Sequence, residues 1–125
     1  MDSIVHFEIP AKDSKRSKDF YSKVFGWEFI DMPEMNYTIV RTTATDDKGM
    51  TLEKGAINGG MMTEKDNGGT NPVLVIMVKS IDEHLKKIEA AGGKVIQPKT
   101  SVGDMGYYAR FKDTEDVVMG IFETK

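Results

Sequence analysis

The feature that most constrains the fold is a glycine-rich stretch in the middle of the chain with a similar pattern on each side. Two glycine pairs, at residues 59–60 and 68–69, bracket a polar run that ends at Asn71 and Pro72. Such a composition is typical of a flexible connection. On each side we predict the same order of elements, namely a strand, a helix and three strands. Because one such half cannot bury its own sheet face, the repeat predicts two paired modules.

In the first half, apolar and polar side chains alternate over residues 4–9, as in a half-buried strand. A helix is predicted from a cap at Asp13 or Ser14 to residue 25, with Gly26 as a left-handed stop. A polar hairpin loop is predicted at residues 45–55. The three other strands of this half are predicted at residues 27–31, 37–43 and 56–62.

In the second half, Ser80 and Glu83 form a capping box for a helix that ends at Gly92 and Gly93. Strands are predicted at residues 73–78, 94–97, 107–112 and 117–123. The chain has 125 residues, which suits a single domain with one sizeable core. We therefore expect one domain over residues 1–125, with modules at 1–65 and 72–125 and a crossover at 66–71.

Charge and composition argue against several partners. The chain has 17 Lys and Arg against 20 Asp and Glu, a net charge of -3, and no long block of either sign. We therefore expect no nucleic-acid partner and no membrane partner. The sequence has no apolar run near the ~20 residues that span a bilayer, and no secretory signal pattern, so a cytoplasmic location is predicted. The absence of Cys excludes disulfides and thiolate chemistry.

Several short motifs together carry a resemblance to a known family. They are His6, the FYSKVFGW run at residues 20–27, the glycine pair at 59–60, Val78 with the helix start at 80–82, the AGG run at 91–93, and GYYARFKD at 106–113. With these the chain resembles the vicinal oxygen chelate superfamily, which includes glyoxalase I, bleomycin-resistance proteins and extradiol dioxygenases. The resemblance implies an α+β fold in which two paired βαβββ modules form an open, curved, eight-stranded barrel-like sheet around a cleft, in a homodimer.

In metal-using members of this superfamily, four side chains, one from each of four strands, coordinate a divalent ion. His, Glu and Gln side chains are suitable ligands for it. His6 matches the first position. The corresponding position in the second half is Val73, the usual Glu of the last strand is Gly120, and the final strand of the first half offers only Asn58. Strand alternation turns Glu123 to the opposite face. The resemblance therefore implies no intact metal centre, although a divalent metal on an incomplete ligand set stays an alternative.

Candidate site residues follow from the same strands. His6 and Glu8 share one strand face and are candidate catalytic residues, since a neutral imidazole can act as a base; the alternative is that His6 is only a satisfied polar residue. Along the strand predicted at residues 107–112, alternation places Tyr108 and Arg110 on one face and Tyr107 on the other. It does not say which face looks inward. Phenol, guanidinium and thioether groups suit a planar or anionic ligand, and the candidates for binding it are Tyr37, Arg41, Met61, Tyr108 and Arg110.

Three functions fit these observations. The first is a bleomycin-resistance-like protein that binds a small, partly apolar organic molecule in the cleft without a metal. The second is an enzyme, either a metal-dependent lyase, isomerase or dioxygenase, or a metal-free acid–base catalyst that uses His6 and Glu8. The third is an interaction module whose sheet is filled by its own side chains or by a partner. The sequence does not rank substrates, and whether the chain is an enzyme stays open.

Overall fold

A computed structural model describes all 125 residues, and the chain divides into two compact units. We call residues His6–Pro72 the N-module, and residues Met1–Val5 together with Val73–Lys125 the C-module. The sequence places the first residues with the first module. They belong to the C-module because the Ser3 carbonyl accepts a hydrogen bond from the Met77 amide at 2.9 Å.

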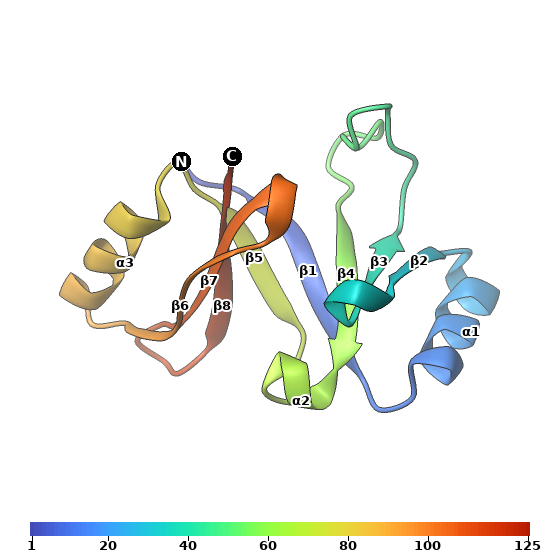
Figure 1. The fold of residues 1–125 in the computed structure, drawn as a ribbon, viewed down its shortest axis with the longest axis horizontal. Coiled ribbons are helices and arrows are strands. Elements are labelled where there is room, and N and C mark those ends of the chain that lie inside the picture. Colours follow the sequence, from blue (N-terminus) through green and yellow to red (C-terminus); the bar gives the residue numbers. More distant parts are fainter. The chain divides into compact units, whose positions relative to one another are not determined.

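The N-module has the predicted strand, helix and three strands (Figure 1). The hydrogen-bonded order of its strands is β2-β3-β4-β1, in which β1 and β4 run parallel and the other neighbours run antiparallel. The N-module elements are β1 (Ile4–Ala11, in this module from His6), α1 (Ser14–Phe25), β2 (Glu28–Met32), the short 3-10 helix η1 (Pro33–Met35), β3 (Tyr37–Arg41), β4 (Asn58–Thr63) and α2 (Glu64–Asn67).

Local signals set the ends of α1. The Asp13 carboxylate accepts a hydrogen bond from the Arg16 amide at 3.0 Å, and Gly26 ends the helix in the left-handed region at φ 72°. The core of this module is formed by Ala11, Val40 and Met61, which pack with the ring of Trp27 and other partly buried aromatic side chains. No residue of α1 itself is buried.

The C-module repeats the plan (Figure 1). Its strand order is β5-β8-β7-β6, with β5 and β8 parallel and the remaining pairs antiparallel. Its core is formed by Val78, Ile81, Ala109 and Ile121, against which α3 packs Leu85 and Ile88. The C-module elements are β5 (Val73–Met77), α3 (Ile81–Ala90), β6 (Lys94–Ser101), the 3-10 helix η2 (Gly103–Met105), β7 (Gly106–Lys112) and β8 (Val118–Thr124).

The fold class predicted from the sequence, α+β with two βαβββ modules, is confirmed, and several details differ. The unpredicted helix α2 overlaps the start of the predicted crossover, and the Thr63 side chain caps it by accepting a hydrogen bond from the Asp66 amide at 3.1 Å. The strand predicted at 94–97 continues across Pro98 to Ser101, because β6 lies at the edge of its sheet and its pairing shifts register between Gln97 and Thr100. The strand predicted from residue 56 begins at Asn58.

The final turn of the chain contains a left-handed residue that is not glycine. Asp116 has φ 62°, and the Asp113 carboxylate accepts hydrogen bonds from the amides of Glu115 and Val117 at 2.8 and 3.0 Å. None of the helices combines the length and the apolar character that crossing a bilayer requires.

Candidate functional site

The candidate site of the N-module lies on the face of its sheet that is turned away from the core under α1. Val40 on β3 and Met61 on β4 are core residues, so the side chains that alternate with them point to the other face. On β1, Glu8 pairs in register with Gly60, and Gly60 in turn pairs with β3. We call this surface the His6 face, and define it by His6, Glu8, Tyr37, Arg41 and Gly60.

His6 is held by Tyr37. The Nε2 atom of the imidazole and the hydroxyl oxygen of Tyr37 are 2.8 Å apart. Burial lowers the pKa of His6 below its usual 6.5, and the negative charge of Glu8 opposes this effect without cancelling it. The imidazole is therefore neutral at neutral pH, and the hydrogen bond joins one phenol to one uncharged ring nitrogen.

Gly60 makes room for that tyrosine. A Cβ atom at Gly60 would collide with the hydroxyl and ring carbons of Tyr37, so the phenol occupies the space that a side chain on β4 would fill. Register explains the geometry, because Ile39 pairs with Gly60 and Tyr37 precedes Ile39 by two residues on the same face. The tyrosine thus lies diagonally across the glycine.

The C-module repeats this arrangement. Arg110 pairs with Gly120 on β8, and Tyr108 precedes Arg110 by two residues. A Cβ atom at Gly120 would lie 2.8 Å from the hydroxyl of Tyr108 and 3.1 Å from a methyl group of Val75. Both glycines and both tyrosines are visible in the sequence, but only the strand register reveals that each tyrosine covers its glycine.

The structure also decides which face Tyr108 and Arg110 occupy. Tyr107 and Phe111 pack against the core under α3, so Tyr108 and Arg110 point to the opposite face of the C-module sheet. The guanidinium is buried, with Arg110 6% exposed, and its Nε atom donates a hydrogen bond to the Tyr108 hydroxyl at 2.7 Å.

One of the predicted site residues has different surroundings from those that the sequence predicts. Met61 is a predicted ligand contact, but it is 1% exposed in the N-module core, on the opposite side of β4 from Gly60, so we leave it out of the site. Alternation puts Met62 on the His6 face instead. The other histidine, His84 on α3, is partly buried, with Nδ1 2.9 Å from the Ser80 carbonyl and Nε2 3.0 Å from the Asp2 carboxylate.

The other side chains considered as metal ligands have structural partners. The Asn58 side-chain oxygen accepts hydrogen bonds from the amides of Thr42 and Thr43 at 2.8 and 3.2 Å. Glu123 points toward α3, as alternation predicts, where it accepts a hydrogen bond from the Ile81 amide at 2.7 Å. Asn58 and Glu123 therefore hold a loop and a helix start.

Of the ligand positions that the resemblance implies, His6 alone carries an imidazole or a carboxylate. No group of three or more His, Asp or Glu side chains is arranged around a common point. In the N-module, Tyr37 already engages the Nε2 atom of His6, and Gly60 has no side chain to add a ligand. The chemistry of the His6 face is that of a neutral imidazole, a phenol, the buried carboxylate of Glu8 and the partly buried guanidinium of Arg41.

Comparisons with known proteins point to the same fold. Residues 3–43 match a family model described as bleomycin resistance protein-like N-terminal. No curated protein matches the chain. Among solved structures, the chain is similar to a hypothetical protein from Bacillus halodurans C-125, with 17% identity over 99% of this chain and 95% of that one and a TM-score of 0.69.

Two further solved structures are epimerases. Methylmalonyl-CoA epimerase from Mycobacterium tuberculosis is 12% identical over 98% of this chain and 87% of its own, with a TM-score of 0.64. A variant of the Streptomyces coelicolor enzyme, in complex with 2-nitronate-propionyl-CoA, is 16% identical over 98% and 94%, with a TM-score of 0.66. At these identities the likeness shows a shared fold.

Proposed function

We propose that the chain binds a small, partly apolar organic molecule without a metal centre. The proposal starts from two observations: the chain has the fold of the vicinal oxygen chelate superfamily, and its first third has a bleomycin-resistance-like sequence. The binding surface is the His6 face. The observation that carries the proposal is the position of Tyr37, which fills the space over Gly60 and bonds the one imidazole that matches a family ligand position.

The groups on the His6 face define the ligand. The Tyr37 hydroxyl is hydrogen-bonded to the neutral imidazole of His6. Because neither group is charged, this pair suits a ligand carbonyl or hydroxyl better than a bare cation. The ring of Tyr37 adds an apolar surface. The Arg41 guanidinium favours ligands that carry a carboxylate or another anionic group. The ligand class is therefore a small molecule with one polar group, an apolar body and no net positive charge.

A small-molecule role also agrees with the structural neighbours. A methylmalonyl-CoA epimerase has been solved in complex with methylmalonyl-CoA, and the Streptomyces coelicolor variant in complex with 2-nitronate-propionyl-CoA. This comparison supports ligand binding by the fold and does not identify the ligand here. The predicted homodimer, the predicted cytoplasmic location and the expected lack of nucleic-acid and membrane partners stay predictions from the sequence.

A second candidate function is metal-free acid–base catalysis, and the neutral state of His6 favours it. In such a reaction Tyr37 passes its hydroxyl proton to the free electron pair of His6, and the phenol oxygen takes a proton from a C–H acid of the bound molecule. The negative charge of Glu8 stabilises the imidazolium that forms. Return of the proton to a different carbon of the bound molecule, with the imidazolium giving its proton back to the phenol oxygen, regenerates both residues, so the net reaction is an isomerisation.

The binding proposal is tested by elemental analysis and a thermal-shift screen. The protein is purified without chelators, reloaded with Ni, Zn, Mn or Fe(II), and screened against small organic acids and phenols. We expect ligands whose affinity does not respond to a chelator and falls roughly three- to tenfold in Tyr37→Phe, which loses one hydrogen bond. Tyr107→Phe is the matched control because Tyr107 packs toward α3.

Two outcomes would decide against metal-free binding. Stoichiometric metal that is lost in His6→Ala would show a metal centre on unconventional ligands. Equal weakening by Tyr37→Phe and Tyr107→Phe would show that the ligand does not use the His6 face. Catalysis is tested separately by incubating each ligand in heavy water. Deuterium uptake at carbon that disappears in both His6→Ala and Tyr37→Phe supports the acid–base function, and binding without uptake rejects it for that ligand.

A further inference from the structure

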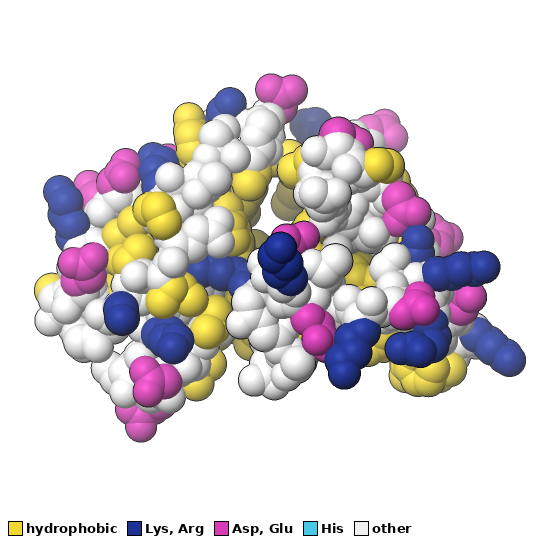
Figure 2. Space-filling model, turned by 60° about the horizontal axis from the view of Figure 1, so that its bottom comes forward, with side chains coloured by type: hydrophobic (Ala, Val, Ile, Leu, Met, Phe, Trp, Pro, Cys, Tyr) yellow, Lys and Arg dark blue, Asp and Glu magenta, His cyan; other side chains and the backbone are white.

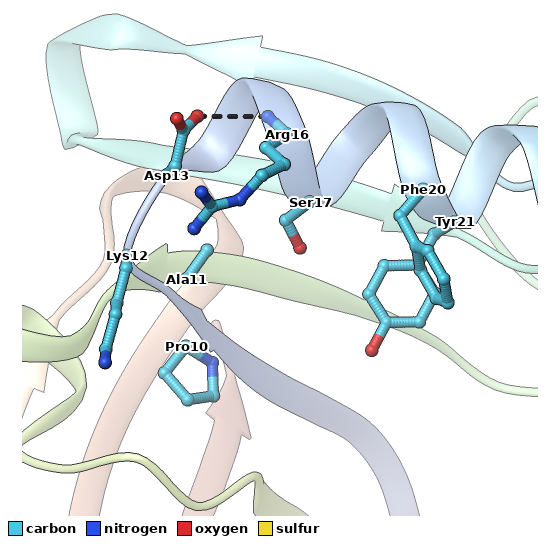
Figure 3. A pocket seen from close by; sticks show the side chains of 8 residues that line it. All are labelled: Pro10, Ala11, Lys12, Asp13, Arg16, Ser17, Phe20 and Tyr21. Atoms are coloured by element: carbon cyan, nitrogen blue, oxygen red, sulfur yellow. Dashed lines mark hydrogen bonds between the residues drawn. The ribbon is translucent and has the colours of Figure 1, made fainter.

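We propose that the N-module has a second binding site, for a small organic anion, at the start of α1. The site is a shallow depression of about 420 Å³, open to solvent, between the end of β1 and the first two turns of the helix (Figure 3). We call it the α1 hollow. It is lined by Pro10, Ala11, Lys12, Asp13, Arg16, Ser17, Phe20 and Tyr21. None of these residues belongs to the His6 face, so this proposal goes beyond the proposed function.

Three polar side chains point toward the hollow and form no hydrogen bonds with one another. Figure 3 shows the guanidinium of Arg16 and the hydroxyls of Ser17 and Tyr21 on the same side of α1, turned toward Pro10 and Ala11. The Arg16 and Ser17 backbone amides are used within the helix, but none of the three side-chain polar groups forms a hydrogen bond or an ion pair within the protein. They are therefore available to a ligand that accepts hydrogen bonds.

The charge of the hollow selects an anion. Lys12 and Arg16 contribute two cations, and neither is in an ion pair. The one carboxylate in the lining, that of Asp13, accepts a hydrogen bond from the Arg16 amide at the helix start. Residues 12–25 carry five basic and two acidic side chains in a chain whose net charge is -3. Figure 2 shows Lys and Arg side chains, with Asp and Glu side chains among them, over the part of the N-module that contains α1.

The apolar part of the lining selects an organic anion over a bare ion. Pro10 and Ala11 form one wall, and the rings of Phe20 and Tyr21 stand opposite (Figure 3). Phe20 is 54% exposed, a large apolar surface for a ligand to cover. Tyr21 is fixed by stacking on Trp27, with ring centroids 4.8 Å apart and planes at 7°. The ligand class is a carboxylate or phosphate ester on a compact apolar or aromatic body.

The stacked Trp27 gives a direct readout, because it is the only Trp in the chain. Phenyl phosphate is titrated into the intact protein while Trp fluorescence is recorded, with inorganic phosphate and phenol as separate probes. We expect saturable binding of phenyl phosphate with Kd on the order of 1 mM or tighter, and at least about tenfold weaker binding of inorganic phosphate and of phenol.

Variants locate the site. Arg16→Gln is expected to weaken binding of phenyl phosphate about tenfold, because a charge-assisted hydrogen bond is lost. Tyr21→Phe keeps the stacked ring and is expected to weaken binding a few-fold. Lys15→Gln is the matched control, since it removes one positive charge from the same helix outside the hollow, and it is expected to change Kd less than about twofold. His6→Ala is expected to leave Kd unchanged, which separates this site from the proposed function.

Four results would overturn the proposal. They are no saturable binding of phenyl phosphate, equal binding of inorganic phosphate, equal loss of affinity in Arg16→Gln and Lys15→Gln, and Arg16-dependent binding to phosphatidylglycerol vesicles with none to phenyl phosphate. The third would show a diffuse charge effect, and the fourth would show that a lipid surface covers the helix instead of a free ligand.

Discussion

The two modules share a backbone plan but differ in how they use it. Each has a capped helix and a tyrosine laid across a glycine of its last strand. The C-module helix α3 buries Ile81 completely, whereas α1 of the N-module buries no residue and leaves Phe20 and Phe25 54% and 60% exposed. The N-module also carries His6, where the C-module has Val73. We infer that α3 contributes mainly packing in the C-module, and that α1, which buries no residue, leaves its surface available for a site in the N-module.

Removing a helix side chain from each module gives the largest expected difference. We expect Ile81→Ala to reduce the free energy of unfolding by about 2–5 kcal/mol, because a fully buried side chain leaves a cavity. Phe20→Ala should reduce it by less than about 1 kcal/mol, because the ring is more than half exposed. Urea unfolding followed by circular dichroism measures both. Equal losses would contradict the comparison and show that α1 is covered in solution, for example by a second copy of the chain.

Substitutions at Gly60 and Gly120 test whether the covering tyrosine packs equally closely on the glycine in both modules. Gly60→Ala should destabilise the protein by about 1–3 kcal/mol, because the new methyl group displaces Tyr37 and breaks its bond to His6. Gly120→Ala should cost less, since its Cβ would lie 2.8 Å from the Tyr108 hydroxyl and 3.1 Å from a carbon of that ring, whereas a Cβ at Gly60 would overlap both the hydroxyl and ring carbons of Tyr37.

Chemical denaturation of each glycine variant, alone and combined with Tyr→Ala at the covering tyrosine, measures the coupling in both modules. We expect Tyr37→Ala to remove most of the cost of Gly60→Ala. If the two costs simply add, Tyr37 does not fill the space over Gly60.

The helix caps should behave alike in both modules. Asp13→Ala and Ser80→Ala each remove a side-chain acceptor from the third amide of a helix, at 3.0 and 3.2 Å. Each should lower stability by about 1 kcal/mol. Thermal unfolding measures the two losses, with Asp13→Asn and Ser80→Thr as variants that keep an acceptor. A loss at Ser80 alone would mean that α1 contributes little to the stability of its module.

The smallest expected effect is a pH dependence that comes from His6 in the N-module. Burial lowers the folded-state pKa of His6 below 6.5, so the unfolded chain binds more protons between the two values. The contribution of the neutral imidazole is complete above about pH 6.5 and is lost as the pH falls toward the lowered pKa. Urea unfolding at a series of pH values should show this loss in the wild type and in His84→Gln, and a flatter profile in His6→Gln. An unchanged profile in His6→Gln would contradict it.

Much of the fold follows from local signals. The helix at residues 14–25 is predicted correctly because both of its end signals are local. The Asp13 carboxylate caps its first turn, and the left-handed conformation of Gly26 ends it. The short helix α2 is not predicted because its signals, Thr63 and Gly68, lie inside a polar stretch typical of loops. The strand across Pro98 is predicted too short because a sequence does not say that β6 is an edge strand.

The sequence by itself determined the repeat, the alternation of His6 with Phe7 along β1, and the lack of metal-ligating side chains at Val73 and Gly120. Only the tertiary structure decided which face of each strand is core, and therefore that Met61 is buried and that Tyr108 turns away from α3. It also decided that Tyr37 covers Gly60 and that a depression lies beside the start of α1. The reason is physical: alternation is a local property of one strand, whereas register and burial depend on segments far apart in the chain.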